Sequence, residues 1–347
     1  MSNKIRFSIF IVLLTFTLLC GLDGNPANAK EASEEKVKIT KEFYIDKLED
    51  GRVEVLDKVI KINEKQADKV LTEMGFSTEE INQITPEIKI DIAKNGGKKV
   101  ETNTEEVSYS MYDPVSNSSY EIKGKSLDEV KEKATKKAKE INESRRKDKG
   151  NEAQTQSVGS TRVLAGGFDQ TYNGWDRVDA EHDWKGQTYV IYNGRTSNGS
   201  ELRYSVYNNF HWDSQPFANF NDEFAVWFNE RGTKYAPNKD SLVSYTGSTS
   251  TVSRELTSKL KEDDLYGTTW EFSWSSPYVI YKVAGWGKQE VRLHSNEMHG
   301  RTYTVQGAHF HPHFPGGKSI DVGVGGITFG LAAGDKWKWT ESFIVND

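Results

Sequence analysis

Tryptophan and histidine are confined to the second half of this chain. All nine tryptophans and all seven histidines lie between Trp175 and Trp339, whereas residues 30–157 contain neither. The earlier segment is rich in Lys and Glu, which favour helices, and the later segment is rich in aromatic residues, Gly and Asn, which favour strands and turns. The break therefore predicts two different kinds of structure joined end to end.

The first 29 residues have the pattern of a secretion signal. Two cations precede an uncharged apolar run over residues 7–19, and a small-x-small triplet ending at Ala29 predicts cleavage after that residue. The run is shorter than the roughly 20 residues of a membrane-spanning helix, so we expect no stable membrane span. Lipid attachment to Cys20 is the alternative, and the bulky Leu19 before it argues against a lipoprotein. We therefore expect a secreted, extracellular protein.

Composition excludes several kinds of function. The formal net charge is −6 and the chain has no basic block, so it lacks the electrostatic footprint of a nucleic-acid-binding protein. Cys20 is the only cysteine and would leave with the signal. The mature chain is then disulfide-free, and it has neither a thiol nucleophile nor a thiolate metal ligand.

Residues 30–142 are predicted to form a small charged α+β domain, which could act as a pro-domain. Capping residues and proline mark where its helices begin, and Gly or Asn marks where they end. The predicted helices cover residues 63–74, a short stretch from 77, residues 86–95 and residues 127–141. The predicted strand pairs are 52–56 with 59–62, and 98–111 with 119–122.

Residues 143–162 are almost entirely polar. Such a stretch cannot bury enough apolar surface to order itself, so we expect a flexible linker between two domains. Its basic residues make it a natural target for extracellular proteases.

Residues 163–347 alternate between apolar and polar side chains, as strands do. Trp270 and Trp274 share one face of such a run, and the Asn-Gly pair at 193–194 is a hairpin-turn signal. Residues 253–260 are the one stretch with a helical pattern. Many short strands with regular turns predict an all-β domain, either an antiparallel β-sandwich of jelly-roll type or a barrel.

A histidine run is the strongest candidate for chemistry. His309, His311 and His313 alternate along a predicted strand, so their imidazoles should project from one face. Two imidazoles at that spacing can hold zinc or copper, and His299 lies a few residues upstream as a further ligand. Pro312 within the run favours an edge strand or a loop. The alternative is an aromatic, histidine-rich surface loop that binds no metal, so no cofactor is certain.

Aromatic side chains outside the alternating runs are candidates for glycan binding. Trp212 and His211 lie in a segment rich in Asn, Asp and Gln, Trp286 is flanked by glycines, and Trp175 lies near Asn and Asp. The C–H groups of a sugar ring can stack on the negative face of such aromatic rings. We therefore predict Trp212 and Trp286 as exposed platforms, with His211 and Trp175 beside them.

One carboxylate stands out in the last predicted strand. Glu341 falls on the otherwise aromatic face of that strand, so it must be paired, hydrogen-bonded or close to the strand end. Asp222, Glu223 and Glu271 are the other carboxylates that we considered for glycoside cleavage, but sequence spacing does not locate such a pair.

Three hypotheses about function follow. The first is a secreted two-domain protein whose β-sandwich binds an extracellular ligand, most plausibly a glycan or another component of a cell envelope. The second is the precursor of a secreted toxin or antimicrobial protein, kept inactive by residues 30–142. The third is a metal-dependent hydrolase or lyase centred on the histidines. We rank them in this order, and so favour a binding protein over an enzyme.

Overall fold

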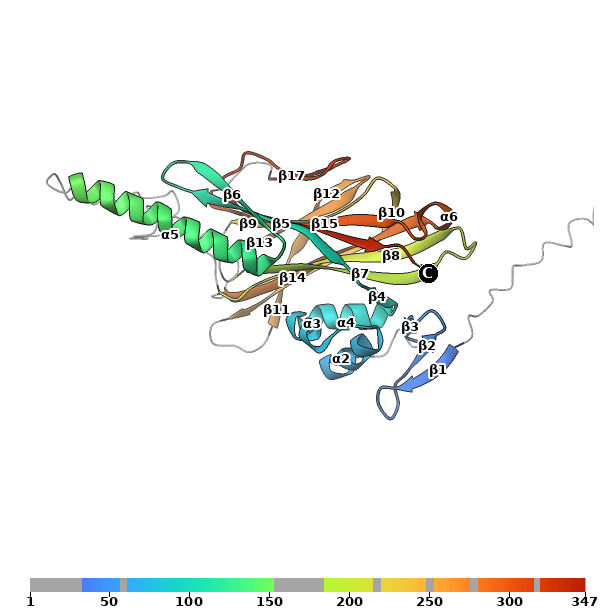
Figure 1. Ribbon diagram of the computed structural model, residues 1–347. Helices are drawn as coiled ribbons and strands as arrows, with labels where there is room; N and C mark the ends of the chain where they lie inside the picture. Colours follow the sequence, from blue (N-terminus) through green and yellow to red (C-terminus); the bar gives the residue numbers. More distant parts are fainter. Residues whose placement is uncertain are drawn as a thin grey trace, which may run out of the picture.

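The computed structural model describes residues 33–56, 61–152, 184–214, 220–247, 253–274, 280–314 and 319–346 (Figure 1). The predicted signal and cleavage site, Trp175 and the last part of the predicted linker lie outside these ranges. Most of the described chain consists of antiparallel strands, as the sequence predicts for its second half.

Two open antiparallel sheets pack face to face. The first has the strand order β11-β10-β14-β8-β7-β4, and the second has the order β12-β13-β9-β15-β18-β5-β6. Buried residues from both sheets form one hydrophobic core between them. Since each sheet keeps two edge strands, the architecture matches the predicted sandwich and not the barrel.

The strands of the first sheet are β4 (Lys98–Val100), β7 (Trp184–Arg195), β8 (Glu201–Trp212), β10 (Gly232–Gly247), β11 (Ser253–Leu256) and β14 (Ile280–His294). Those of the second are β5 (Asn103–Asp113), β6 (Ser118–Gly124), β9 (Asn221–Phe228), β12 (Ser258–Asp264), β13 (Gly267–Ser273), β15 (Thr302–Pro312) and β18 (Gly334–Ile344). The helix predicted over residues 253–260 is wrong. Those residues pair as β11 and β12 at the two sheet edges, where cross-strand pairing outweighs a weak helical pattern.

Three short helices cover the outer face of the first sheet (Figure 1). They are α2 (Glu64–Glu73), α3 (Thr78–Gln83) and α4 (Pro86–Asn95). Asn63 and Ser77 form the capping boxes that open α2 and α3, and a proline opens α4, so these three helix predictions are confirmed. Their apolar faces pack on Tyr189, Tyr207 and Trp286 of the sheet.

A separate three-stranded sheet precedes these helices. It consists of β1 (Ser33–Lys38), β2 (Tyr44–Leu48) and β3 (Val53–Glu54). β3 pairs with β2, so the predicted pairing of residues 52–56 with 59–62 is wrong.

The chain before the composition break does not form a self-contained α+β domain. β4 extends the first sheet beside β7, and β5 lies inside the second sheet, between β18 and β6. Tyr109 of β5 stacks on Trp337 of β18 with ring centroids 3.8 Å apart. Removing residues 30–142, as the toxin-precursor hypothesis requires, would therefore take strands out of both sheets.

A long helix, α5 (Leu127–Glu152), packs on β5 and β6 (Figure 1). Its buried Val130, Ala134 and Ala138 belong to the same core as the sandwich interior. The helix continues ten residues into the segment predicted as a flexible linker, where Lys139 faces Glu143 one turn later and Arg145 pairs with Asp113 of β5.

Smaller elements complete the described fold. The hairpin of β16 (Ile320–Gly323) and β17 (Gly326–Phe329) covers part of the outer face of the second sheet, and α6 (Ser295–Met298) joins β14 to β15. Within the described ranges, no helix is both long and apolar enough to cross a membrane.

Candidate functional site

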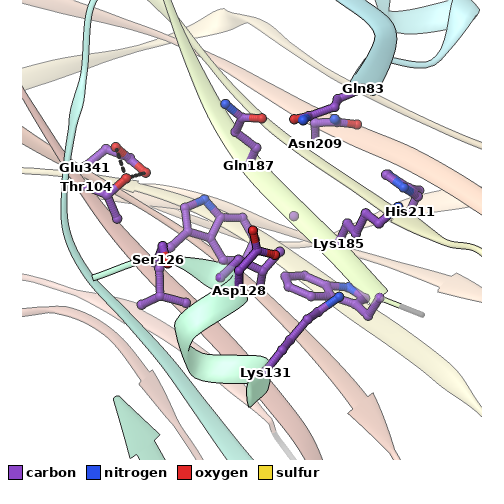
Figure 2. Close-up of a pocket in the computed structure, with 15 residues that line it drawn as sticks. Gln83, Thr104, Ser126, Asp128, Lys131, Lys185, Gln187, Asn209, His211 and Glu341 are labelled. Carbon is purple, nitrogen blue, oxygen red and sulfur yellow. Dashed lines mark hydrogen bonds between the residues drawn. The ribbon is translucent and has the colours of Figure 1, made fainter. Parts of the chain in front are cut away.

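A pocket of about 340 Å³ opens beside the first half of β7 (Figure 2). β4 pairs with β7 only at Val190–Tyr192. The earlier part of β7, Trp184–Thr188, pairs with β8 on one side and has an open edge on the other in the described structure. The pocket is bounded by β7 and β8 from the first sheet, β5 and β18 from the second, the first turn of α5 and the end of α3. It therefore lies at the seam between the two sheets.

Two indoles form the apolar wall of this pocket. Trp184 and Trp339 both line it, and their rings lie 5.5 Å apart. The Trp339 Nε1 donates a hydrogen bond to Thr188 Oγ1 at 2.6 Å, which fixes that ring. A Cβ atom on Gly186 would lie 2.3 Å from Cη2 of Trp184, so glycine is what lets the Trp184 ring fold back along its own strand. Trp184 also stacks on Trp337 in the core.

Two buried polar atoms in the pocket wall have no hydrogen-bond partner among the described residues. One is the donor Nε1 of Trp184, and the other is the acceptor Oδ1 of Asn209. Both side chains are almost fully buried. Nearby, the Tyr189 hydroxyl donates to Gln187 Oε1 at 3.0 Å, which orients that amide beside the pocket. Leaving a buried polar group unpaired costs about 1–3 kcal/mol, so each of these two atoms would be stabilised by a hydrogen-bonding partner.

Glu341 is the buried carboxyl of the pocket. A register shift between Thr340 and Glu341 interrupts the pairing of β18 with β5, and such bulges re-aim side chains. Thr104 Oγ1 lies 3.0 and 3.2 Å from the two carboxyl oxygens (Figure 2). Burial raises the pKa of Glu341 to about 7, against the weaker lowering effect of Thr104 and Thr102. The sequence correctly marked this residue as needing a hydrogen-bonding partner.

The charged residues at the pocket mouth are largely compensated. Lys185 donates to Asp213 at 2.8 Å. His211 lines the same pocket, and burial lowers the pKa of its imidazole despite the opposing effect of Asp213. A second hollow of about 620 Å³ adjoins the first and shares Gln83, Lys185 and His211 with it. The two hollows together form a groove that runs from the sheet seam to the helical layer.

The predicted exposed aromatic platforms are wrong. Trp212 is 1% exposed and Trp286 is 3% exposed. Trp212 packs on His309 in the sandwich interior and also lines the second hollow, whereas Trp286 lies beneath the helices α2 to α4. His211 is the predicted ligand-binding residue that does line the pocket, and Trp175 lies outside the described residues.

The three histidines share one face of β15, as their spacing predicts, but that face is the sandwich interior. His309 Nε2 donates to Asp222 Oδ2 at 2.9 Å, and His311 Nδ1 donates to Asp222 Oδ1 at 2.8 Å. His313 Nε2 bonds to Asp335 Oδ2 at 2.8 Å. His299 is exposed and precedes the opposite end of the strand.

This arrangement does not fit zinc or copper. The described residues contain no group of three His, Cys, Asp or Glu side chains that could hold a metal ion. Burial alone would raise the pKa of Asp222, but the two histidines hold it below its ordinary value. Trp274 Nε1 also donates to Asp222 at 2.8 Å. The carboxylate therefore satisfies three buried N–H groups, and the predicted metal cluster is a polar network within the core.

The sequence did not identify the pocket, because its residues come from six elements that are distant along the chain. Trp184 and Trp339 alternate with polar neighbours and so resemble ordinary core residues. Asn209 and Gln187 carry no sequence signal at all. Glu341, a carboxyl on an aromatic face, was the one clue available.

No protein-family model matches the chain, and no curated protein matches it either. The collagen-binding subdomain of the Enterococcus faecalis surface protein ACE is 7% identical to it, covering 44% of this chain and 92% of that one, with a TM-score of 0.26. A collagen-binding domain from a Staphylococcus aureus adhesin is also 7% identical, with a TM-score of 0.24, and the match covers 46% of this chain and 95% of that domain. AvmM, which catalyses macrocyclization in alchivemycin A biosynthesis, is 12% identical, with a TM-score of 0.22, and the match covers 48% of this chain and 89% of AvmM. TM-scores this low carry no argument about the fold or the ligand.

Proposed function

We propose that this chain is a secreted protein that binds an uncharged glycan in the pocket between β7, β18 and α5. The observation that carries the proposal is the unpartnered donor and acceptor, Trp184 Nε1 and Asn209 Oδ1, in the wall of one pocket. Trp184 faces the sandwich interior and Asn209, which pairs with Gln187, faces the helical layer, so a ligand that bonds both atoms must reach around the open edge of β7. A chain of several sugars, whose hydroxyls both donate and accept hydrogen bonds, can do so. Such pairing would recover the free energy that each unpaired atom costs.

The remaining lining also suits a sugar. The indoles of Trp184 and Trp339 line the pocket from beneath, but at 0% and 3% exposed they offer no open face for stacking, so hydrogen bonds must carry the recognition. The amides of Gln83 and Gln187 lie at the mouth, where they can bond ring hydroxyls (Figure 2). Pockets for small ligands measure about 300–1,000 Å³. This pocket falls within that range, and most of its lining side chains are polar, as hydrogen bonding to hydroxyl groups requires.

The charges favour an uncharged ligand. Lys185 donates to Asp213, which Lys282 also approaches, and the carboxyls of Asp128 and Glu341 line the pocket, where they would repel a phosphate or a carboxylate. An extended groove at the seam of a β-sandwich is also open to a chain longer than one sugar.

Isothermal titration calorimetry of residues 30–347 with cellotriose, maltotriose and triacetylchitotriose tests the proposal. We expect at least one of these uncharged trisaccharides to bind at about pH 6. Trp184→Phe removes the free N–H and keeps most of the ring, so it should weaken binding by about tenfold.

Trp286→Phe is the matched control for this experiment. Trp286 is also buried and its Nε1 is also unpartnered among the described residues, but it lies under the helical layer and does not line the pocket. Binding should be unchanged in this variant. Equal losses in both variants, or no binding by any of the three sugars, would contradict the proposal.

A further inference from the structure

We propose that Glu341 is the specificity-determining residue of this pocket and restricts it to uncharged sugars. This inference rests on the proposed glycan-binding function and deepens it. Glu341 is 6% exposed and lines the pocket opposite the first turn of α5. Its carboxyl is therefore a group that an incoming ligand covers.

The hydrogen bonds of Glu341 leave room for a ligand. Thr104 and Thr102 each supply one hydroxyl proton, whereas a carboxylate has about four acceptor sites on its two oxygens. Glu341 takes part in no ion pair within the described ranges, so no cation compensates its charge. The neutral carboxyl can donate its proton to a ligand hydroxyl, which the ionised form cannot do.

The charged groups around Glu341 disfavour a second negative charge. Glu105 on β5 raises the pKa of Glu341 by repulsion, and Asp128 on α5 lines the same pocket. On the opposite strand β15, the residue paired with Glu341 is the apolar Val305. The cations Lys131 and Lys185 and the imidazole of His211 also line the pocket.

Those three cationic or ionisable groups do not offset the carboxylates. Lys185 is held by Asp213, and burial keeps the pKa of His211 below its ordinary value. Lys131 lies near the His211 side of the pocket, since its charge contributes to lowering the pKa of that imidazole.

Covering Glu341 with an uncharged sugar removes its remaining water and brings no cation. Desolvation disfavours the ionised carboxyl, so the protonated form should bind the sugar more tightly. With a pKa of about 7, the protonated fraction falls steeply above neutrality. Affinity for an uncharged sugar should then drop by about tenfold between about pH 6 and about pH 8. A uronic acid sugar, which stays anionic throughout, should bind weakly at the lower pH and lose at least as much affinity at the higher one.

The test measures wild-type affinity at about pH 6 and about pH 8 by calorimetry. The probes are the uncharged trisaccharides cellotriose, maltotriose and triacetylchitotriose, together with trigalacturonic acid as the anionic probe. Glu341→Gln replaces the carboxyl by a neutral group of the same shape and should make the affinity for the uncharged sugar independent of pH. Asp128→Asn, which removes the exposed carboxyl of the same pocket, is the matched control and should keep the tenfold dependence.

The outcomes separate this inference from the proposed function. If no uncharged trisaccharide binds at either pH, the glycan-binding proposal itself fails. Equal wild-type affinity at both pH values, or trigalacturonic acid binding as tightly as the uncharged sugars, overturns only the role of Glu341. The wild-type comparison stands without any variant, and a pH dependence that survives in a folded Glu341→Gln protein would also overturn that role.

Discussion

The chain before the composition break and the chain after it differ in amino-acid usage but share one architecture. Residues 30–157 have no tryptophan or histidine, yet their β4 and β5 lie in the same sheets as the tryptophan-rich strands. The first region contributes the edge strands β4 and β6, the strand β5, a covering helix and a helical layer, all of which have few large aromatics. The second region supplies the wide inner faces that do need them. A composition break can therefore separate segments that supply different elements of one core, and need not mark a domain boundary.

The largest expected effect comes from expressing residues 163–347 alone, which tests whether the second region can fold without the first. β18 would lose its neighbour β5, and the inner face of the second sheet would lose the cover of α5. We expect this fragment to be insoluble or to lack the near-ultraviolet circular dichroism of packed tryptophans. Adding residues 30–152 should restore that signal. A soluble, cooperatively unfolding fragment would show that the second region is a domain after all.

A single contact between the two regions gives the next largest effect. Tyr109 stacks on Trp337 and donates a hydrogen bond from its hydroxyl to Asp335 Oδ1 at 2.8 Å. Tyr109→Ala should cost about 3–5 kcal/mol of unfolding free energy, as large-to-small changes in cores do. Tyr44→Ala, at a 37% exposed position on β2, is the control and should cost less than about 1 kcal/mol in the same denaturant titration. Similar losses in both variants would argue against a shared core.

The pH dependence of the unfolding free energy tests the burial of Glu341, which lies on β18 and bonds Thr104 of β5. Below the ordinary Glu pKa of 4.5, Glu341 is protonated in both the folded and the unfolded chain and has no effect. As the pH rises towards about 7, the unfolded chain loses this proton first, so stability falls. Glu341→Gln should therefore stabilise the fold by up to about 3 kcal/mol at about pH 8 and by almost nothing at about pH 4. A pH-independent difference in unfolding free energy between the two proteins would contradict the raised pKa.

The smallest expected effect comes from the glycine beneath the pocket wall. Gly186→Ala places a methyl group against the Trp184 ring, which must move into the pocket. We expect a loss of about 1–3 kcal/mol in stability and a clear loss of sugar binding. Gly325→Ala has nothing within 4 Å of its added Cβ and should leave both unchanged. Unaltered binding by Gly186→Ala would place the ligand away from Trp184.

The sequence predicts local features of this fold well and long-range ones poorly. The caps at Asn63 and Ser77 act over three residues, so the helices that they begin were found from the sequence. The hairpin of β5 and β6, which a short turn joins, was also found, but its first strand was predicted to begin at residue 98, whereas Lys98–Val100 pair with β7 in the first sheet. The insertion of β5 between β18 and β6 joins residues more than 200 positions apart, and no local pattern signals it.

The candidate site was predicted less well than the fold. The sequence places Trp212 outside the alternating runs, in a segment rich in Asn, Asp and Gln, but this residue ends strand β8 and its ring faces the interior. The histidine spacing gave the correct shared face and the wrong chemistry, since the partner carboxylate Asp222 comes from a strand far along the chain. Only His211 and the unusual position of Glu341 pointed to the pocket.

Glycan binding at Trp184 is tested most directly by nitrogen-15 NMR, which follows the indole N–H signals of the nine tryptophans while an uncharged trisaccharide is added. Substitution of Trp184 and Trp286 by Phe assigns the two decisive signals. We expect the Trp184 signal to move as its free N–H gains a partner, while the Trp286 signal stays in place. Saturable sugar binding that leaves the Trp184 signal unmoved, or that moves the Trp286 signal instead, would contradict a glycan site at the seam of the two sheets.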